Sequence, residues 1–211
     1  MKRIAVMSSH RGTNLQAIID GAKRRLFAGT VELVISNNKS SYALVRAREA
    51  GIPTLWISRK FSSSQEEFEH KIIDALSSHD IDIVCLAGFM RVLSASFIAR
   101  YRGRMLNIHP ALLPSFPGMD AQRQALCHGV KISGCTVHFV DEGVDTGPII
   151  LQRAVPVLDD DTVESLSERI LAEEHVAYIE ALKLVCEDRL CIRGNRVFTR
   201  CPEPTGGTSI D

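Results

Sequence analysis

The chain has 211 residues, of which 45% are hydrophobic and 24% are charged, and this mix excludes intrinsically disordered and collagen-like proteins. Lysine plus arginine and aspartate plus glutamate both number 25, so the formal net charge is zero, which argues against a protein that mainly binds nucleic acid. The longest apolar run, residues 83–90, has eight residues, far fewer than the roughly 20 that span a membrane.

From the N-terminus onward, the hydrophobic pattern predicts strands that alternate with helices. The predicted elements are a strand over 2–8, a helix over 15–26, a strand over 31–36, a helix over 43–50, a strand over 54–57, a helix from 63 or 64 to 76, a strand over 81–87, a helix from about 94, a strand over 105–108, a helix over 121–128, strands over 133–140 and 148–157, and a helix over 162–187. Helix boundaries carry the usual signals, such as Gly51 and Pro53 after the second helix and a segment resembling a capping box at 63–67.

This alternation predicts the fold class. Nearly continuous apolar strands separated by helices indicate an α/β fold, a doubly wound, mostly parallel, Rossmann-like sheet with helices on both faces. We expect one domain over residues 1–200 and a flexible tail over 201–211, which is rich in proline, glycine and threonine. Ligands of such folds bind beyond the carboxyl ends of the strands.

The turn after the first predicted strand is a candidate anion site. Gly12, Thr13 and Asn14 open the first helix, where backbone N–H groups have no intrahelical acceptor. Gly12 lets an anion approach the backbone closely, and the next two side chains can add hydrogen bonds. The turn matches neither GxGxxG nor the P-loop, so a dinucleotide or nucleoside triphosphate is not indicated. An ordinary turn with a polar cap is the alternative.

A polar pair ends the fifth predicted strand. Asn107 and His109 are two residues apart, so both point to one side of the strand, and Pro110 follows them. An imidazole can transfer a proton near neutral pH, and a side-chain amide can stabilise an oxyanion. The alternative is a hydrogen-bonded histidine at a strand end with no chemical role.

An acidic turn, residues 141–148, separates the last two predicted strands. Its Asp145 could orient His109 and stabilise the imidazolium form, whereas a solvated hairpin is the alternative. The sequence has no GxSxG nucleophile elbow, no EF-hand pattern and no CxxC pair among its six cysteines. An Asn–His–Asp set without a nucleophile indicates direct transfer between two bound substrates.

Four ordered segments together resemble the phosphoribosylglycinamide formyltransferases of purine synthesis, over nearly the whole chain from Lys2 to about Arg193. They are Gly-Thr-Asn-Leu-Gln-Ala-Ile at 12–18, Leu-Ala-Gly-Phe-Met-Arg-Val-Leu at 86–93, Leu-Asn-Ile-His-Pro-Ala-Leu-Leu-Pro at 106–114, and Gly-Cys-Thr-Val-His-Phe-Val at 134–140, which leads into 141–148. The resemblance implies a formyltransferase catalytic domain in which 10-formyltetrahydrofolate, as co-substrate, gives its formyl group to the amine of 5-phosphoribosylglycinamide, with no metal.

The resemblance also implies roles for individual residues. The catalytic set would be Asn107, His109 and Asp145, with Thr136 behind the histidine. The residues that would bind the ribonucleotide substrate are Gly12, Thr13, Asn14 and Glu174. The residues that would bound the folate pocket are Met90, Arg91, Val92, Leu93, Asp141, Glu142, Gly143 and Val144.

Three positions depart from the family pattern. His10 stands where the family commonly has the first glycine of the anion turn. Gln65 stands where arginine is common, which weakens a contact with the glutamate tail of the folate. Asp120 stands where histidine is common, so it is not assigned to the site.

Two related classes share this kind of domain. Methionyl-tRNA formyltransferases add a C-terminal RNA-binding domain, and formyltetrahydrofolate hydrolases add an N-terminal regulatory domain; we expect neither here. The alternatives that stay open are a hydrolase and a non-catalytic phosphosugar-binding protein. We expect small-molecule substrates as partners, no nucleic acid, no membrane, a cytoplasmic location, and a monomer or homodimer.

Overall fold

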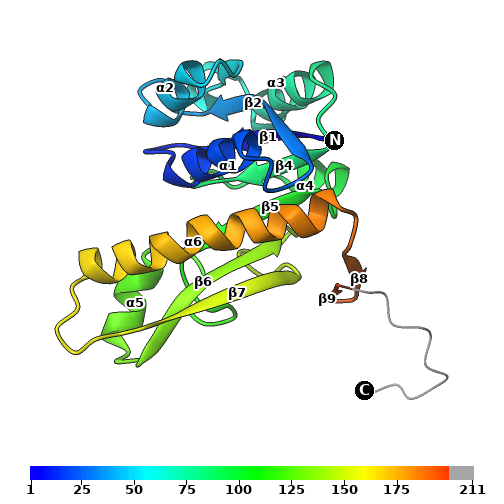
Figure 1. Ribbon diagram of the computed structural model, residues 1–211. Helices are drawn as coiled ribbons and strands as arrows, with labels where there is room; N and C mark the ends of the chain where they lie inside the picture. Colours follow the sequence, from blue (N-terminus) through cyan, green and yellow to red (C-terminus); the bar gives the residue numbers. More distant parts are fainter. Residues whose placement is uncertain (200–211) are drawn as a thin grey trace.

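The computed structural model describes residues 1–199, and their strands form one nine-stranded sheet. Along the sheet the order is β3-β2-β1-β4-β5-β6-β7-β9-β8 (Figure 1). The strands are β1 (Lys2–Met7), β2 (Gly29–Ser36), β3 (Thr54–Trp56), β4 (Ile83–Leu86), β5 (Met105–His109), β6 (Ile132–Phe139), β7 (Ile149–Pro156), β8 (Cys191–Arg193) and β9 (Arg196–Phe198). The helices are α1 (Thr13–Lys23), α2 (Tyr42–Glu49), α3 (Gln65–Ser78), α4 (Ala95–Arg100), α5 (Ala121–Cys127) and α6 (Val163–Cys186), with a 3₁₀ turn η1 (Arg59–Phe61).

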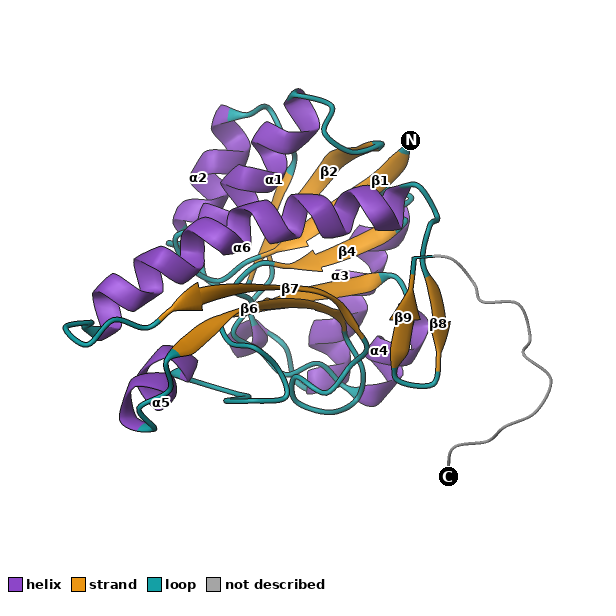
Figure 2. Cartoon of the chain, turned by 60° about the horizontal axis from the view of Figure 1, so that its bottom comes forward, coloured by secondary structure: helices purple, strands orange, loops and turns teal. Residues whose placement is uncertain are grey.

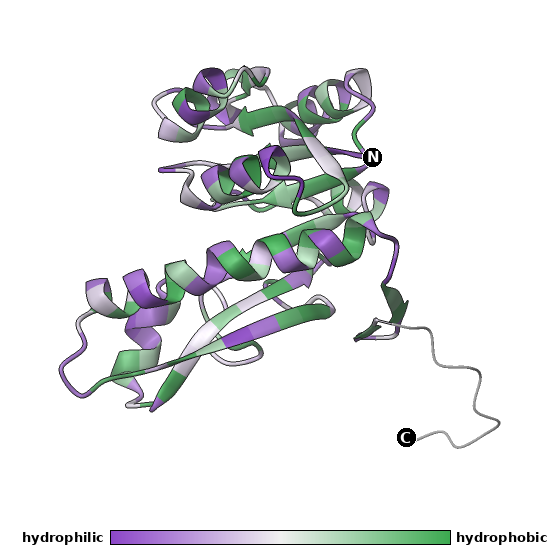
Figure 3. Cartoon of the chain, viewed as in Figure 1, coloured by the Kyte–Doolittle hydropathy of each residue, from purple (hydrophilic) through white to green (hydrophobic). Residues whose placement is uncertain are grey.

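Both faces of the sheet are buried, because successive side chains of a strand point to opposite faces. In β1, Ile4 and Val6 belong to one buried cluster, whereas Ala5 and Met7 belong to the other. The first cluster packs against α1, α2, α5 and α6, and the second packs against α3 and α4. Figure 3 shows hydrophobic and hydrophilic residues alternating along α6, as expected for a helix with one face against the sheet. The predicted α/β fold with helices on both faces is confirmed.

The first half of the sheet is parallel and contains a switch in winding direction. β3, β2, β1, β4 and β5 are parallel neighbours. The chain winds from β1 outward to β3, and α3 then returns it to β4, on the other side of β1. A switch point therefore lies between β1 and β4, and the carboxyl ends of strands at such a point are where open α/β sheets bind ligands.

The second half of the sheet is mixed. β6 runs antiparallel to β5, and β7 runs antiparallel to β6 as a long hairpin (Figure 2). β9 is parallel to β7, and β8 is antiparallel to β9. Of the eight pairings among the described strands, five are parallel, which confirms the predicted mostly parallel sheet.

The predicted elements occur in the predicted order, with differences at their ends. α1 ends at Lys23 rather than residue 26, and β4 begins at Ile83 rather than residue 81. β8, β9 and η1 were not predicted, because three-residue elements are too short to show a periodic pattern. The single domain over 1–200 stays a prediction, and the predicted tail lies outside the described residues. Among the described helices, none combines the length and apolar character needed to cross a membrane.

Candidate active site

At the carboxyl end of β5, two of the predicted catalytic residues, Asn107 and His109, each lie within hydrogen-bonding distance of the third, Asp145. The Asp145 carboxylate lies between the other two residues. Its Oδ2 atom is 3.2 Å from His109 Nδ1, and its Oδ1 atom accepts a hydrogen bond from Asn107 Nδ2 at 3.4 Å. His109 is only 4% exposed. The arrangement can therefore hold a charged imidazole in a largely desolvated position.

Local sequence explains why these side chains meet. Along β5, Leu106 and Ile108 pack into the core, so Asn107 and His109 point to the opposite side. Asp145 lies in the loop between β6 and β7, in the left-handed region with φ 55°. Gly147 allows this loop to fold tightly, since a Cβ atom there would lie 1.8 Å from the Phe139 carbonyl oxygen.

The backbone of the segment after β5 holds His109 and Asp145. His109 Nε2 donates to the Phe116 carbonyl at 2.8 Å, and the Gly118 N–H donates to Asp145 Oδ2 at 2.8 Å. The two partners of the His109 ring, a carboxylate and a carbonyl, are both acceptors. Both contacts are hydrogen bonds only when each ring nitrogen carries a proton. Both ring nitrogens of His109 therefore face hydrogen-bond acceptors.

His138 is a fourth polar side chain of this cluster, and it was missed from the sequence. Its Nε2 atom lies 3.3 Å from Asn107 Nδ2 and 3.7 Å from Asp145 Oδ1. Burial alone would raise the pKa of Asp145, but hydrogen bonds from His138 and the Gly118 amide, together with the charges of His138 and His109, hold this pKa below its ordinary value. Asp145 is therefore ionised at neutral pH.

Thr136 lies directly opposite His109 on the neighbouring strand β6. Its hydroxyl is fully buried, donates to the Ala111 carbonyl at 2.7 Å and accepts from the Leu113 N–H at 3.0 Å. Gln152 Nε2 on β7 donates to the same oxygen at 3.0 Å. Thr136 thus fixes the start of the segment that carries Phe116 and Gly118, and does not itself bond the imidazole.

The predicted anion turn lies at the N-terminus of α1. Gly12 has φ 68°, and a Cβ atom there would lie 2.8 Å from Ala43, so a larger residue would be both strained and crowded. No side chain caps α1, which leaves its first N–H groups free for a ligand. The carbonyl of His10 accepts from Ser41 Oγ at 2.8 Å and from the Ala43 N–H at 3.2 Å, so the start of α2 holds the turn.

Asn14 and Glu174 connect this turn to α6. Asn14 Nδ2 donates to Glu174 Oε2 at 2.8 Å, and both side chains are buried. The Asn14 Oδ1 atom is buried and has no hydrogen-bond partner, which leaves an acceptor for a ligand. Burial raises the pKa of Glu174 to about 7, although the hydrogen bond from Asn14 acts in the opposite direction. Two groups predicted to bind the ribonucleotide are therefore in direct contact.

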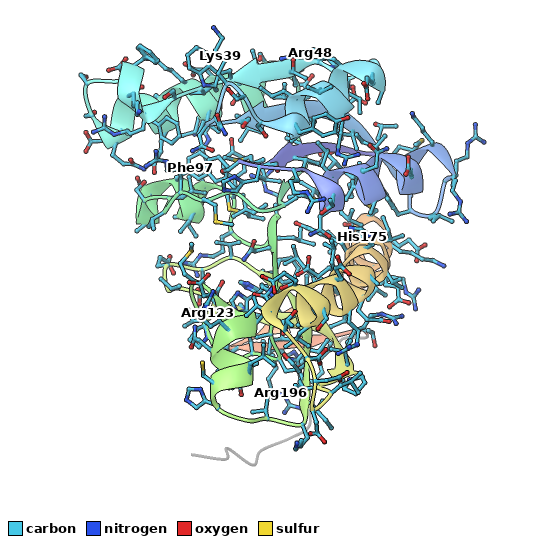
Figure 4. The ribbon with its side chains drawn as sticks, turned by 90° about the vertical axis from the view of Figure 1, so that its left-hand side faces the viewer. Lys39, Arg48, Phe97, Arg123, His175 and Arg196 are labelled. Atoms are coloured by element: carbon cyan, nitrogen blue, oxygen red, sulfur yellow. The ribbon has the colours of Figure 1, made fainter. Side chains whose placement is uncertain are left out.

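A groove between α1 and α6 lies beside the anion turn and has a volume of about 510 Å³. Thr13 and Arg46 line it on one side and His175 on the other, and Figure 4 shows His175 on α6. Asn107, His109 and Asp145 do not line this groove. The polar cluster around Asp145 and the groove are therefore separate features.

The residues predicted to bound the folate pocket are placed differently from one another. Met90, Arg91 and Val92 are exposed, with Val92 82% exposed, whereas Leu93 is 7% exposed and packs into the core near α3 and α4. Leu93 can therefore line a pocket only through its backbone.

The second predicted folate segment belongs to the loop that carries Asp145. Asp141 Oδ1 accepts from the Gly143 N–H at 3.1 Å and from Thr146 Oγ1 at 2.7 Å, and Glu142 pairs with Arg102. Val144 is exposed. Within residues 1–199, no three histidine, cysteine or acidic side chains are grouped as metal ligands would be.

Known proteins of similar sequence and structure have names that agree with one another. The formyl transferase family model matches residues 2–182. Phosphoribosylglycinamide formyltransferase of Escherichia coli (strain K12) is 42% identical over 195 residues, which cover 92% of each chain. The crystal structure of glycinamide ribonucleotide transformylase 1 from Symbiobacterium toebii is 53% identical, with a TM-score of 0.92 over 93% of each chain.

Two further relatives differ more in organisation. The human trifunctional purine biosynthetic protein adenosine-3 is 51% identical over 183 residues, but the chain spans only 18% of its length, and 14% of that of the Drosophila melanogaster protein. A formyltetrahydrofolate deformylase from Pseudomonas syringae is 27% identical, with a TM-score of 0.86, and 65% of its chain is covered. With one family model matching most of its residues and relatives of similar length above 40% identity, the chain belongs to the formyl transferase family.

Proposed function

We propose that the protein transfers the formyl group of 10-formyltetrahydrofolate directly to the amine of 5-phosphoribosylglycinamide, a step of purine biosynthesis. The observation that carries this proposal is the contact of Asn107 and His109 with one carboxylate, that of Asp145, at the carboxyl end of β5. The relatives that this chain covers almost entirely are named phosphoribosylglycinamide formyltransferases, and these names support the choice of substrate.

The amine nitrogen attacks the formyl carbon, and a tetrahedral intermediate with a negatively charged oxygen forms. The Asn107 amide and the His109 imidazolium are the donors that meet this oxygen. The bond from His109 to the Asp145 carboxylate is charge-assisted and therefore stronger than the bond to the neutral Phe116 carbonyl. We expect the Nε2–H to exchange the Phe116 carbonyl for the substrate oxygen, while Nδ1 keeps its bond to Asp145.

The proton of the attacking amine must also move. As the new C–N bond forms, the nitrogen becomes acidic and gives its proton to Asp145, directly or through a water molecule. Collapse of the intermediate breaks the bond between the formyl carbon and N10 of the folate, and N10 takes up the proton. No covalent enzyme intermediate and no metal enter this sequence, because side chains supply both the donors and the base.

The anion turn provides a place for the other end of the ribonucleotide. The free N–H groups at the start of α1 suit a phosphate, since the helix dipole favours negative charge there. Asn14 and Glu174, which are hydrogen-bonded to each other beside this turn, suit hydroxyl groups of the ribose. With a pKa near 7, Glu174 can both donate and accept hydrogen bonds near neutral pH.

The exposed side chains of Met90 and Val92 and the loop 141–144 would bound the pterin and its tail. The Thr136 hydroxyl would act through the segment 111–113 and so keep Phe116 and Gly118 in place. We further propose that the enzyme acts in the cytoplasm on small molecules alone, as a monomer or homodimer.

The test is turnover of purified protein with 10-formyltetrahydrofolate, with and without 5-phosphoribosylglycinamide, followed by release of tetrahydrofolate. We expect turnover only when the ribonucleotide is present, and none with His109→Ala. Turnover without the ribonucleotide would instead support a hydrolase. Binding of either ligand without turnover would support a non-catalytic phosphosugar-binding protein.

A further inference from the structure

Residues 88–94 form an irregular segment that is fixed at both ends. At its start, the Ser9 N–H donates to the Gly88 carbonyl at 3.0 Å, and the Met90 N–H donates to Ser9 Oγ at 2.8 Å. At its end, Ser94 caps α4 by accepting from the Phe97 N–H at 3.2 Å. The side chains of Met90 and Val92 lie between these two points and are exposed.

The end of this segment is held by a buried carboxylate on α3. Glu69 is only 3% exposed, and its Oε1 atom accepts from the Ser94 N–H at 2.6 Å. Its Oε2 atom accepts from the Ser94 hydroxyl. Gln65, one turn earlier on α3, donates to Glu69 Oε1 at 2.7 Å and to the Val92 carbonyl at 3.2 Å. Three donors therefore converge on this one carboxylate.

This arrangement is specific to a carboxylate. Burying a carboxylate is costly unless hydrogen bonds compensate the lost hydration. Glutamine at position 69 would offer one acceptor oxygen to three donors, and its NH₂ group would face at least one of them. Phe68 and Ile72, the neighbouring buried positions of α3, already anchor the helix to the core, so the hydrogen bonds of Glu69 fix the segment rather than the helix.

We propose that Glu69 is a positioning residue for formyl-donor binding: from α3 it holds Val92–Ser94 so that Met90 and Val92 project toward the folate before it binds. This inference rests on the proposed function, because it takes residues 90–93 as part of the folate pocket. A segment that is already ordered loses less entropy when the ligand binds. Loss of this order therefore weakens binding of the formyl donor without changing the reacting groups.

The experiment compares Glu69→Gln with Glu67→Gln. Glu67 lies two residues earlier on the same helix, but its carboxylate bonds Ser63 and Lys71 and not the segment 88–94. Each variant removes one negative charge from α3. We expect Glu69→Gln to raise the KM for 10-formyltetrahydrofolate about tenfold, with kcat and the KM for the ribonucleotide changed less than about twofold. Glu67→Gln should leave all three constants near those of the wild type.

Amide hydrogen exchange without ligands provides a second measurement. The Ser94 N–H should exchange faster in Glu69→Gln than in Glu67→Gln, since its acceptor is altered. Glu69→Asp keeps the charge on a shorter side chain and should give a smaller rise in the donor KM; it replaces Glu69→Gln if that variant does not fold.

If the wild type is active and the position-69 and position-67 variants have equal KM values for the formyl donor, the role of Glu69 is overturned and the proposed function stands. Equal loss of kcat and of both KM values in the position-69 variants would also overturn the role of Glu69, as a general structural defect. Absence of ribonucleotide-dependent turnover in the wild type would overturn the proposed function, and the inference with it.

Discussion

Asp145 determines how two histidines and an asparagine can act together. Its Oδ2 atom contacts His109 and the Gly118 N–H, and its Oδ1 atom contacts Asn107. His109, Asn107 and Asp145 could be selected from the sequence because each ends a strand or occupies a loop at the expected edge of the sheet. His138 could not, because it stands within an apolar strand and its polar contacts come from other segments.

Asn107→Ala removes one donor from the position proposed for the oxyanion. We expect kcat to fall about 10²- to 10³-fold, because this donor is needed more in the transition state than in the ground state. The dissociation constant for the folate should change little, since an interaction made mainly in the transition state contributes little to ground-state binding. Steady-state kinetics and a folate-binding titration check both expectations. Near-normal turnover would remove Asn107 from the mechanism.

Glu174→Gln should change how stability depends on pH. The pKa of Glu174 is about 7 in the folded protein, against its ordinary value of 4.5. Between these values the folded state keeps a proton that the unfolded state releases, so this group's contribution to the unfolding free energy is fully present below pH 4.5 and is lost as the pH rises through 7. The glutamine of the variant does not titrate, so its unfolding free energy lacks this pH-dependent decrease. Between pH 4.5 and 8, the unfolding free energy of the variant should therefore rise by up to about 3 kcal/mol relative to that of the wild type.

Urea unfolding at pH 5 and pH 8 measures this difference. Glu168→Gln, on the exposed side of the same helix, is the matched control and should follow the wild type. A wild type and a Glu174→Gln variant with parallel pH profiles would show that burial does not perturb this carboxyl group.

Helix α6 connects the predicted anion turn to β5, the strand that carries Asn107 and His109. Glu174 bonds Asn14, and four residues later the buried Tyr178 hydroxyl lies 2.9 Å from the Leu86 carbonyl and 3.2 Å from the Leu106 carbonyl. These carbonyls belong to β4 and β5, and Leu106 directly precedes Asn107. The long apolar repeat predicted this helix, but the sequence could not show that its one buried tyrosine would bridge two strands.

Tyr178→Phe removes this bridge and leaves two buried carbonyls with one donor fewer. We expect the free energy of unfolding to fall by about 1–3 kcal/mol. Chemical denaturation measures it, with Tyr42→Phe, at a half-exposed position of α2, as the control that should be nearly neutral. Equal stability of the two variants would contradict a structural role for the hydroxyl.

The order of the strands places the three segments of the proposed site side by side. The anion turn follows β1, the segment 88–94 follows β4, and the polar pair ends β5, and these three strands are neighbours in the sheet. Alternating apolar strands and helices predicted the parallel half. The sequence offered a hairpin of β6 and β7 only as the alternative interpretation of the turn 141–148, because strand direction depends on pairing and not on local sequence. That hairpin supplies Asp145, so the site is complete only in the folded chain.

Direct transfer predicts the fate of a formyl group labelled with ¹³C in 10-formyltetrahydrofolate. In a single turnover with 5-phosphoribosylglycinamide, mass spectrometry should find the label in the ribonucleotide. The amount of labelled ribonucleotide should equal the amount of tetrahydrofolate released. The intact mass of the protein should stay unchanged throughout. Label recovered as free formate, or bound to the protein, would contradict transfer between two bound substrates by Asn107, His109 and Asp145.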